Sequence, residues 1–475
     1  MNKYRTATTI FAIILCVQMT IGSIPGWGMT ILDEEKLSEK FMREATKYFT
    51  FIDDPVINRY ITAIGNRIVK VLPRHPYQFR FYVIKEDSYN AFAGPGGVIF
   101  VNSGLLAAME NPGELAGIIG HEIIHVYSRH ISDRIDRSKQ IGIVTLAGLV
   151  AAIALGAAGV GAAANAMAIG SVAAGQSLAL SYSREDELQA DQLGLKILVK
   201  AGYHPAGLVS ILNKIRKKQW VDTNQVPTYL RTHPAAEDRV AYINAWIDRQ
   251  KNLPVSLSSE NHMAFDWISA RVSALYGDKN VVLTQYADAI KKAPNDPLVN
   301  YGYGLVLARI GHYQESARYL RKALSQRAFD ADLLIDLGRV YFLDGRFNAA
   351  SDTLEGALGI DSDKIDGRYY MGRTRLALKK IPEAVAIFKA LLKTDPTHRD
   401  LIYFASQAYG QQGNMKEAYY YLGQHYYRQG RAKQAIVQLE KAVELTDDAE
   451  RKEKIQAMLK ELRREVARRR SSSDQ

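Results

Sequence analysis

The chain has 475 residues, of which 47% are hydrophobic and 23% charged, and this length allows two to three domains. It contains one cysteine, Cys16, which excludes a disulfide framework, so the fold must be stabilised by packing. The formal net charge of +11 leaves nucleic acid, an anionic lipid surface or an acidic protein as candidate partners.

Residues 1–28 are predicted to be a secretory signal peptide. Lys3 and Arg5 precede an apolar run at residues 10–17, and small residues with a proline follow. This run is too short to span a bilayer, which favours a cleaved signal over a membrane anchor. Removal of the segment would also remove the only cysteine.

Two short segments, residues 79–84 and 98–101, are predicted to be strands because apolar and β-branched residues dominate them. Pro95, Gly96 and Gly97 lie just before the second segment and signal a turn. A strand beside a catalytic helix can pair with an extended peptide and orient its scissile carbonyl. The sequence therefore predicts a surface that could hold a peptide substrate.

A helix is predicted to begin after Asn111, with Pro112 at its first position and Glu114 at its third. The residues up to Gly120 are small or apolar, as a buried helix requires. Whatever chemistry lies further along this helix is therefore expected inside the protein, where a low dielectric strengthens the field of an ion.

The most informative pattern, His121-Glu122-Ile123-Ile124-His125, lies on this helix. Residues four apart share a helix face, so the two imidazoles can hold one Zn²⁺, and the glutamate can act as general base on the metal-bound water. An ordinary buried helix with two partnered histidines is the alternative. His130 lies about 140° round a continuous helix from His125, so it is not expected on the metal face.

Residues 141–180 contain no charged side chain, and about half of them are alanine or glycine. If residues before and after this segment bind one metal ion, they must lie on the same side of any membrane. The segment can therefore cross the membrane either twice or not at all. Two spans need about 20 residues each, which leaves none for a turn. A close-packed helical hairpin beside the active site is therefore expected, either as a lid or at a membrane surface, with two spans as the alternative.

Zinc needs a third protein ligand, and Glu187 is the expected one. Asp191 lies four residues later on the same predicted helix face, where it could accept a hydrogen bond from a ligating histidine. A solvated acidic helix start is the alternative.

These motifs resemble the zinc metallopeptidase family that includes the CAAX prenyl proteases and HtpX. The resemblance covers about half of the chain, residues 37–246, and includes the segment at 90–101 and Thr232-His233-Pro234 followed by Arg239. It implies an α+β zincin-like domain, predicted at residues 29–251, in which His233 is a fourth ligand or a transition-state donor. The implied site has one Zn²⁺ with ligands His121, His125 and Glu187, catalytic residues Glu122 and His233, and supporting residues Asp191 and Arg239.

Residues 252–263 are predicted to be a linker, and residues 264–455 a tetratricopeptide solenoid built only of helices. Glycines recur there at a spacing of 34 or its multiples, as in Gly311 and Gly345. The period then breaks to 17 at a later glycine, which predicts that one extra helix reverses the roles of those that follow. Such a solenoid offers a concave surface for a peptide or protein.

Residues 456–475 are predicted to be a basic tail that is helical, solvated and frayed. Nucleic acid is disfavoured as a partner because a secreted protein rarely meets it and no base-stacking module is evident. Peripheral contact with anionic lipid, or with an acidic partner, is the remaining interpretation of the charge.

A zinc peptidase joined to a tetratricopeptide solenoid behind a signal peptide resembles proteases of the Gram-negative periplasm. The resemblance implies degradation of misfolded or stalled outer-membrane proteins and assistance to their assembly. The solenoid would then dock on the outer-membrane assembly machinery or on the precursors themselves. The rival hypothesis is a chaperone or scaffold whose zinc site is structural or latched, because a site with four protein ligands has no place for water.

Overall fold

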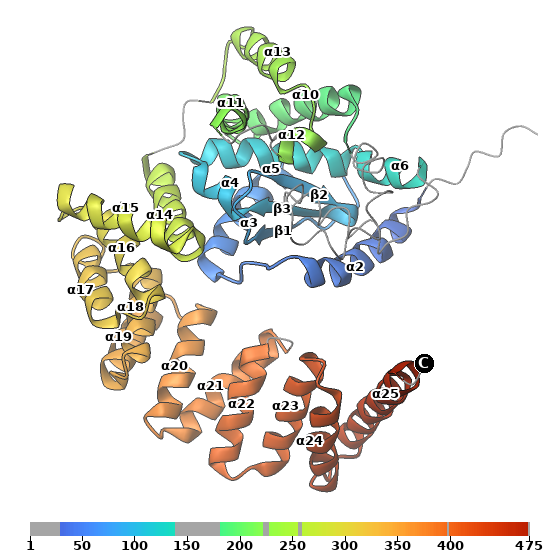
Figure 1. Cartoon of the computed structure of the whole chain (residues 1–475), viewed down its shortest axis with the longest axis vertical. Helices are drawn as coiled ribbons and strands as arrows, with labels where there is room; N and C mark the ends of the chain where they lie inside the picture. The colour runs from blue at the N-terminus through green and yellow to red at the C-terminus, as the bar shows by residue number, and fades with distance from the viewer. Residues whose placement is uncertain (1–28, 138–180, 222–227, 255–258, 397–398, 474–475) are drawn as a thin grey trace, which may run out of the picture. The chain divides into compact units, whose positions relative to one another are not determined.

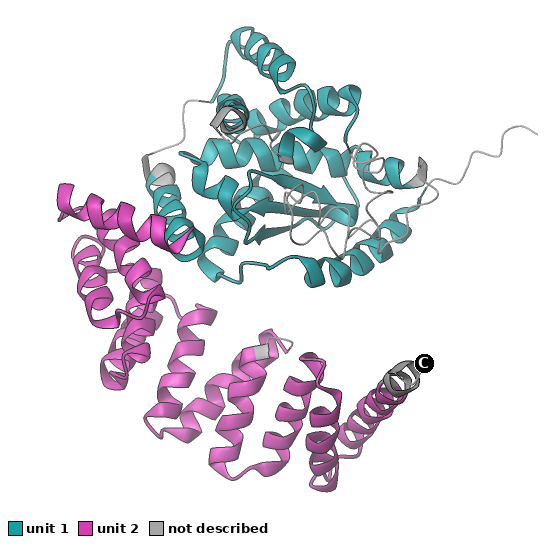
Figure 2. Ribbon diagram, in the orientation of Figure 1, with its two compact units in different colours: residues 1–277 teal, residues 278–475 magenta. Residues whose placement is uncertain are grey.

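The computed structural model describes residues 29–137, 181–221, 228–254, 259–396 and 399–473. The predicted signal peptide and the predicted hairpin at 141–180 lie outside these ranges. The chain divides into two compact units, residues 1–277 and 278–475 (Figure 2).

The first unit combines one small sheet with helices, as expected for an α+β domain (Figure 1). Its elements are α2 (Ile31–Tyr48), α3 (Pro55–Val69), β1 (Arg80–Ile84), β2 (Ala91–Gly94), the 3-10 turn η1 (Pro95–Gly97), β3 (Val98–Asn102), α4 (Ser103–Ala108), α5 (Pro112–Tyr127), α6 (His130–Arg137), α10 (Arg184–Lys200), α11 (Ala206–Val221), α12 (Thr228–Thr232), α13 (Ala236–Asp248) and α14 (Ser259–Tyr276).

The sheet has the strand order β1-β3-β2, with β1 parallel and β2 antiparallel to the central strand β3. The predicted turn joins β2 to β3, and Gly96 and Gly97 adopt positive φ angles of 70° and 89° in it, where a side chain would be strained. Both predicted strands are confirmed. Among the described residues, the outer edge of β2 pairs with no further strand.

Both faces of the sheet are covered. On β3, Val98 and Phe100 contribute to an aromatic-rich cluster with Phe41 of α2, while Ile99 and Val101 belong to the main core of the unit. All five residues of β3 are buried. Helices α3 and α5 pack on the main-core side, and α5 also contacts β2, α10 and α11. Helix α5 is therefore the central helix of the unit.

The boundary between the units differs from the predicted linker at 252–263. Helix α14 begins within that range, at Ser259, and packs on α3 and α4 of the first unit. The buried Arg271 of α14 forms a two-point ion pair with Asp54, the N-cap residue of α3, at 2.8 and 2.9 Å. This long-range pair assigns α14 to the first unit, and local composition does not reveal it.

The second unit is built only of helices, as predicted for a solenoid (Figure 1). They are α15 (Lys279–Lys292), α16 (Pro297–Arg309), α17 (Tyr313–Leu324), α18 (Ala331–Leu343), α19 (Phe347–Ile360), α20 (Ile365–Ala377), α21 (Ile381–Thr394), α22 (Arg399–Gln412), α23 (Met415–Arg428), α24 (Ala432–Glu444) and α25 (Ala449–Ser473).

The half-period break at Gly430 inserts one helix, as predicted. In the regular repeats a glycine of the first helix packs on the second helix, and a Cβ at Gly338 would lie 2.6 Å from Leu354. Gly423 of α23 has the same relation to Leu439 of α24, at 2.7 Å. Helix α23 therefore acts as the second helix of one hairpin and as the first helix of the next.

The predicted end of the repeats at residue 455 falls inside a helix. Helix α25 is continuous from Ala449 to Ser473, and Ile455, Leu459 and Leu462 are buried against α24. The start of the predicted basic tail at 456 is therefore wrong, because an apolar stripe continues past it. In the described ranges, no helix combines the length and hydropathy that a membrane span requires.

Candidate metal centre

Helix α5 is fixed by its cap and by close packing. The side chain of Asn111 accepts a hydrogen bond from the Glu114 N–H at 3.0 Å, and Pro112 occupies the first turn, as predicted. A Cβ at Gly117 would lie 2.8 Å from backbone atoms of α11, so only glycine allows this approach. Every residue of α5 from Glu114 to Val126 is buried. The two histidines and the glutamate of the motif thus lie in the core.

Helix α10 supplies the acidic residues. Ser183 caps it and forms a capping box with Asp186, which satisfies two backbone donors of the first turn. Glu187 and Asp191 face inward and are 2% and 0% exposed. The interpretation of this segment as a solvated acidic face is therefore excluded for these two residues.

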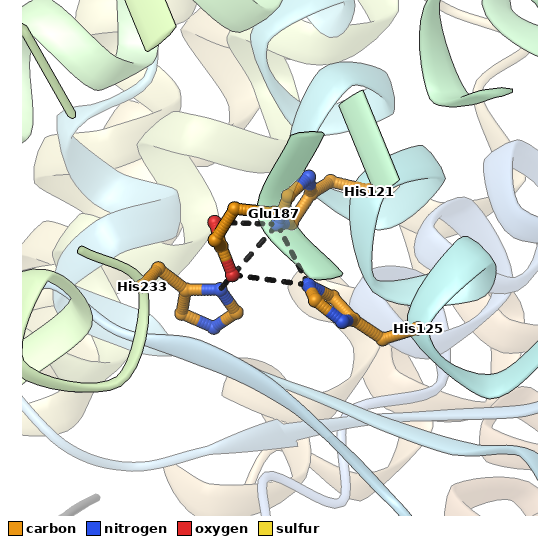
Figure 3. Close-up of side chains that lie close together, drawn as sticks. All are labelled: His121, His125, Glu187 and His233. Carbon is orange, nitrogen blue, oxygen red and sulfur yellow. Dashed lines mark hydrogen bonds and ion pairs between the residues drawn. The ribbon is translucent and has the colours of Figure 1, made fainter. Parts of the chain in front are cut away.

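Four side chains converge from α5, α10 and the residue after α12 (Figure 3). The Nε2 atoms of His121 and His125 lie 3.0 Å apart. Glu187 Oε1 is 3.3 Å from His125 Nε2 and 2.9 Å from His233 Nδ1. His233 Nδ1 is 3.4 Å from His121 Nε2. All four side chains are buried, and one atom from each lies within 4.8 Å of the others.

This geometry suits a small cation. A tetrahedral shell with bonds of about 2.0–2.1 Å separates its ligand atoms by roughly 3.3 Å, close to the separations of 2.9 to 3.4 Å between these nitrogens and Glu187 Oε1. Burial lowers the pKa of His125 well below its usual value and that of His233 to about 4. Both imidazoles are therefore neutral at pH 7 and keep a lone pair for a metal.

The carboxylate of the cluster is ionised. Burial alone would raise the pKa of Glu187, but Arg239, His233 and His121 together hold it well below its usual value. The cluster therefore offers one anionic oxygen and the neutral nitrogens of His125 and His233. Although burial and Arg239 oppose it, Glu187 and Asp191 raise the pKa of His121 to about 9, so His121 would release a proton on binding a metal. This donor set matches the ligands that Zn²⁺ takes in proteins.

Asp191 and Arg239 lie beside the cluster and contact it. Asp191 Oδ1 lies 2.8 Å from His121 Nδ1, the nitrogen that points away from the cluster. Arg239 of α13 donates to both oxygens of Asp191 at 2.8 Å and contacts Glu187. Tyr242 also donates to Asp191. Asp191 therefore orients the His121 ring, and Arg239 balances two buried carboxylates.

Glu122 is buried beside the cluster, where its carboxyl group could exchange a proton. It is fully buried, and no hydrogen bond of ordinary geometry reaches either carboxylate oxygen, although the backbone of Ala93 lies near enough to oppose the rise in its pKa slightly. Burial raises its pKa to about 8, with Glu187 contributing and His121 opposing. His233 Nε2 lies 3.5 Å from Glu122 Oε1, so His233 faces the glutamate as well as the cluster.

Three residues near the site were not predicted to belong to it. The ring of Tyr182 stacks on His125 with centroids 3.7 Å apart, and the ring of Tyr229 stacks on His233 at 4.2 Å. His130 Nδ1 lies 2.9 Å from His125 Nδ1. The two tyrosines carried no signal among 27 tyrosines. The sequence does not predict His130 near the site, because a continuous helix would carry it about 140° round from His125.

Comparison with known proteins agrees with this geometry. Residues 55–247 match peptidase family M48. Three tetratricopeptide repeat families match residues 283–330, 307–376 and 416–449. The last of these ranges contains α23 and α24 as one repeat, in agreement with the inserted helix.

Several curated bacterial proteins are similar over both units. The beta-barrel assembly-enhancing protease of Yersinia pestis is 26% identical over 327 residues, 68% of this chain and 64% of that one. A Vibrio cholerae relative is 31% identical over 328 residues, 67% and 66% of the two chains. The beta-barrel assembly-enhancing protease of Escherichia coli K12 is 25% identical over 353 residues, 73% and 70% of the two chains. The chain thus spans about two thirds of the length of these relatives.

Proposed function

Since the first unit is a domain of peptidase family M48 and the second carries tetratricopeptide repeats, we propose that the chain is a zinc-dependent endopeptidase of the periplasm. Its substrates would be misfolded or stalled outer-membrane proteins. The observation that carries the proposal is the buried cluster of three histidines and one glutamate with Glu122 beside it. The names of the relatives support the substrate class.

The metal would be held by His121, His125 and Glu187. A bound zinc ion would act as a Lewis acid and bring the pKa of a coordinated water to about 7. Glu122 accepts a proton on a carboxylate oxygen and returns it to the leaving amine. The pKa of Glu122, about 8 because of burial, is close enough to neutrality for both transfers. The buried position of Glu122 keeps bulk water from competing for that proton.

The outer edge of the sheet, which pairs with no further strand among the described residues, is the proposed site of substrate pairing. Strand β2 is an outer strand and packs directly on α5. An extended segment that paired with β2 would gain main-chain hydrogen bonds along it and would pass the helix that carries Glu122. Pairing of this kind recognises the substrate through its main chain rather than its side chains. It therefore suits a peptidase that accepts unfolded chains of varied sequence.

The repeats are the proposed docking part. A tetratricopeptide solenoid presents an extended concave surface that binds peptides or proteins, and the relatives' name refers to assembly of β-barrels. The proposed partners are therefore the outer-membrane assembly machinery and its unfolded clients. Peripheral contact with anionic lipid through basic residues of α25 is a further part of this proposal.

One observation favours a second candidate function, a chaperone or scaffold with a latched site. His233 completes a set of four donors at separations that suit a closed tetrahedral shell, and closed zinc sites are structural or inactive. In an active enzyme His233 would instead leave the shell, or donate from its position beside Glu122 to the developing oxyanion.

The test is zinc content and cleavage of casein or an unfolded barrel protein by the wild type, Glu122→Gln and His233→Ala. The peptidase proposal expects zinc in all three chains and no cleavage by Glu122→Gln. Cleavage by that variant would refute the assignment of the base. Higher activity of His233→Ala would support the latch, whereas lower activity would support oxyanion stabilisation. Zinc without cleavage in any chain would favour the scaffold.

A further inference from the structure

His130, which follows helix α5, contacts the proposed metal ligand His125 at the ring nitrogen that faces away from the cluster. We propose that His130 is a positioning residue that accepts a hydrogen bond from His125 Nδ1–H and thereby keeps the His125 Nε2 lone pair free for the metal. The proposal rests on the proposed function, because it concerns the same centre. It assigns His130 a part comparable to that of Asp191, on the other histidine of the motif.

Three distances define the arrangement. His125 Nδ1 and His130 Nδ1 lie 2.9 Å apart, within hydrogen-bond range. His130 Nε2 lies 2.7 Å from Gln189 Oε1 and 3.7 Å from Asp186 Oδ1. His125 and His130 are 0% and 5% exposed, so water has little access to the bond between the two rings.

The position of one proton follows from these contacts. A carboxylate and an amide oxygen can only accept hydrogen bonds, so both neighbours of His130 Nε2 favour a proton on that nitrogen. A neutral imidazole carries one proton, which leaves a lone pair on His130 Nδ1. The bond between the two rings must then be donated by His125 Nδ1–H, and the unprotonated nitrogen of His125 is Nε2, the atom that faces the cluster.

The backbone explains how a residue outside the helical face reaches His125. Helix α5 ends at Tyr127, and Arg129 has a positive φ of 61°. This left-handed residue interrupts the helix, so a separate helix α6 starts at His130 and its imidazole lies against that of His125. Arg129 is held in that conformation by the buried Glu34, which accepts from its guanidinium at 2.8 Å. A continuous helix would have carried His130 away.

The two histidines of the motif are thus supported differently. His121 Nδ1 is bonded to a charged carboxylate, Asp191, which Arg239 balances. His125 Nδ1 is bonded to a neutral imidazole that is itself oriented from α10. His130 is oriented by Asp186 and Gln189, which lie on either side of Glu187 in α10. One helix therefore supplies a proposed ligand, Glu187, and indirectly fixes a second one, His125. Partners of this kind typically change metal affinity by about 10- to 100-fold when removed.

Two substitutions of His130 by amide residues of similar shape distinguish a positioning role from a packing role. The side-chain oxygen of His130→Asn falls near the former Nδ1 position and can still accept from His125. The amide of His130→Gln falls near the former Nε2 position and leaves His125 Nδ1–H without an acceptor. We expect His130→Gln to lose about 10- to 100-fold in zinc affinity and His130→Asn to stay close to the wild type. The full-length chains would be titrated with zinc against a chromophoric chelator.

A spectroscopic readout tests the bond itself. In ¹⁵N-histidine-labelled, zinc-loaded wild type, a scalar coupling across the hydrogen bond should join the Nδ1 atoms of His125 and His130, with the proton on His125. Absence of that coupling, or equal zinc affinities of wild type and His130→Gln, would overturn the proposal. If His130→Gln did not fold, the wild-type coupling would still decide. A wild type that bound no zinc would instead refute the proposed function.

Discussion

The Glu122→Gln substitution is expected to stabilise the zinc-free peptidase unit at neutral and alkaline pH. Glu122 is fully buried, no hydrogen bond of ordinary geometry reaches its carboxylate, and burial raises its pKa from 4.5 to about 8. Glutamine has the shape of the protonated glutamate and cannot ionise. The folded variant should therefore avoid the free-energy cost of burying an ionisable carboxyl group, which destabilises the wild type.

The sign and size of that penalty follow from linkage. A carboxyl whose pKa is higher in the folded state destabilises the fold once the unfolded chain begins to lose its proton, so the penalty starts near pH 4.5 and grows until about pH 8. At pH 7.5 the penalty amounts to about 3–5 kcal/mol, and at pH 5 to about 1 kcal/mol. For a unit of this size, each kcal/mol shifts the unfolding midpoint by about 2–4 °C.

The assay is thermal unfolding of the full chain after zinc removal, at several pH values between 5 and 8.5. The transition of the peptidase unit is identified as the one that zinc shifts. Glu122→Gln should raise its midpoint above that of the wild type, and the difference should widen with pH. Glu185→Gln on the exposed start of α10 is the matched control and should leave the midpoint unchanged. Added zinc should narrow the difference, because a nearby cation favours the ionised glutamate.

Parallel pH profiles for wild type and Glu122→Gln would refute this reasoning. They would mean that the carboxylate is solvated in the folded protein or is already neutralised by a positive group. A lower midpoint for the variant at pH 8 would mean that the charged form makes a favourable contact.

Four other single substitutions test contacts within the two units. Asp191→Asn should weaken zinc binding by about 10- to 100-fold in a chelator competition, and an unchanged affinity would exclude the hydrogen bond to His121 as support for the metal. Gly117→Ala should destabilise the first unit in chemical denaturation because its Cβ would meet backbone at 2.8 Å, whereas Gly356→Ala, with nothing within 4 Å, should stabilise the solenoid by up to about 1 kcal/mol. Arg271→Met should cost about 3–5 kcal/mol by leaving the Asp54 carboxylate buried and unpaired, and a double change with Asp54→Asn should recover most of it.

Local patterns were sufficient for the elements that carry the site. Asn111 and Pro112 marked the start of α5 because capping depends on a few consecutive residues. The four-residue spacing of His121 and His125 placed both on one helix face, and the same spacing placed Glu187 and Asp191 together. These relations hold within a single helix, so no knowledge of the tertiary fold was required.

Boundaries were less predictable, because they depend on contacts between distant segments. The sequence placed the linker at 252–263 by its turn-forming residues, but the Arg271–Asp54 pair assigns α14 to the first unit. The tail was separated at 456 by its charge, but Leu459 and Leu462 continue the apolar stripe of α25. Composition records local polarity, whereas a unit boundary records which surfaces become buried.

The sequence by itself determined the helix of the His121–Glu122–His125 motif, the acidic partner helix and the repeat period with its half-step. It did so because helix caps, face spacing and repeat length are short-range properties of the chain. Only the tertiary structure decided that His233 meets Glu187 at 2.9 Å, that Arg239 balances the buried carboxylates, and that His130 turns back to His125. These contacts join different elements, or depend on one left-handed residue between two helices. Their geometry is set by how the helices pack rather than by any periodicity in the sequence.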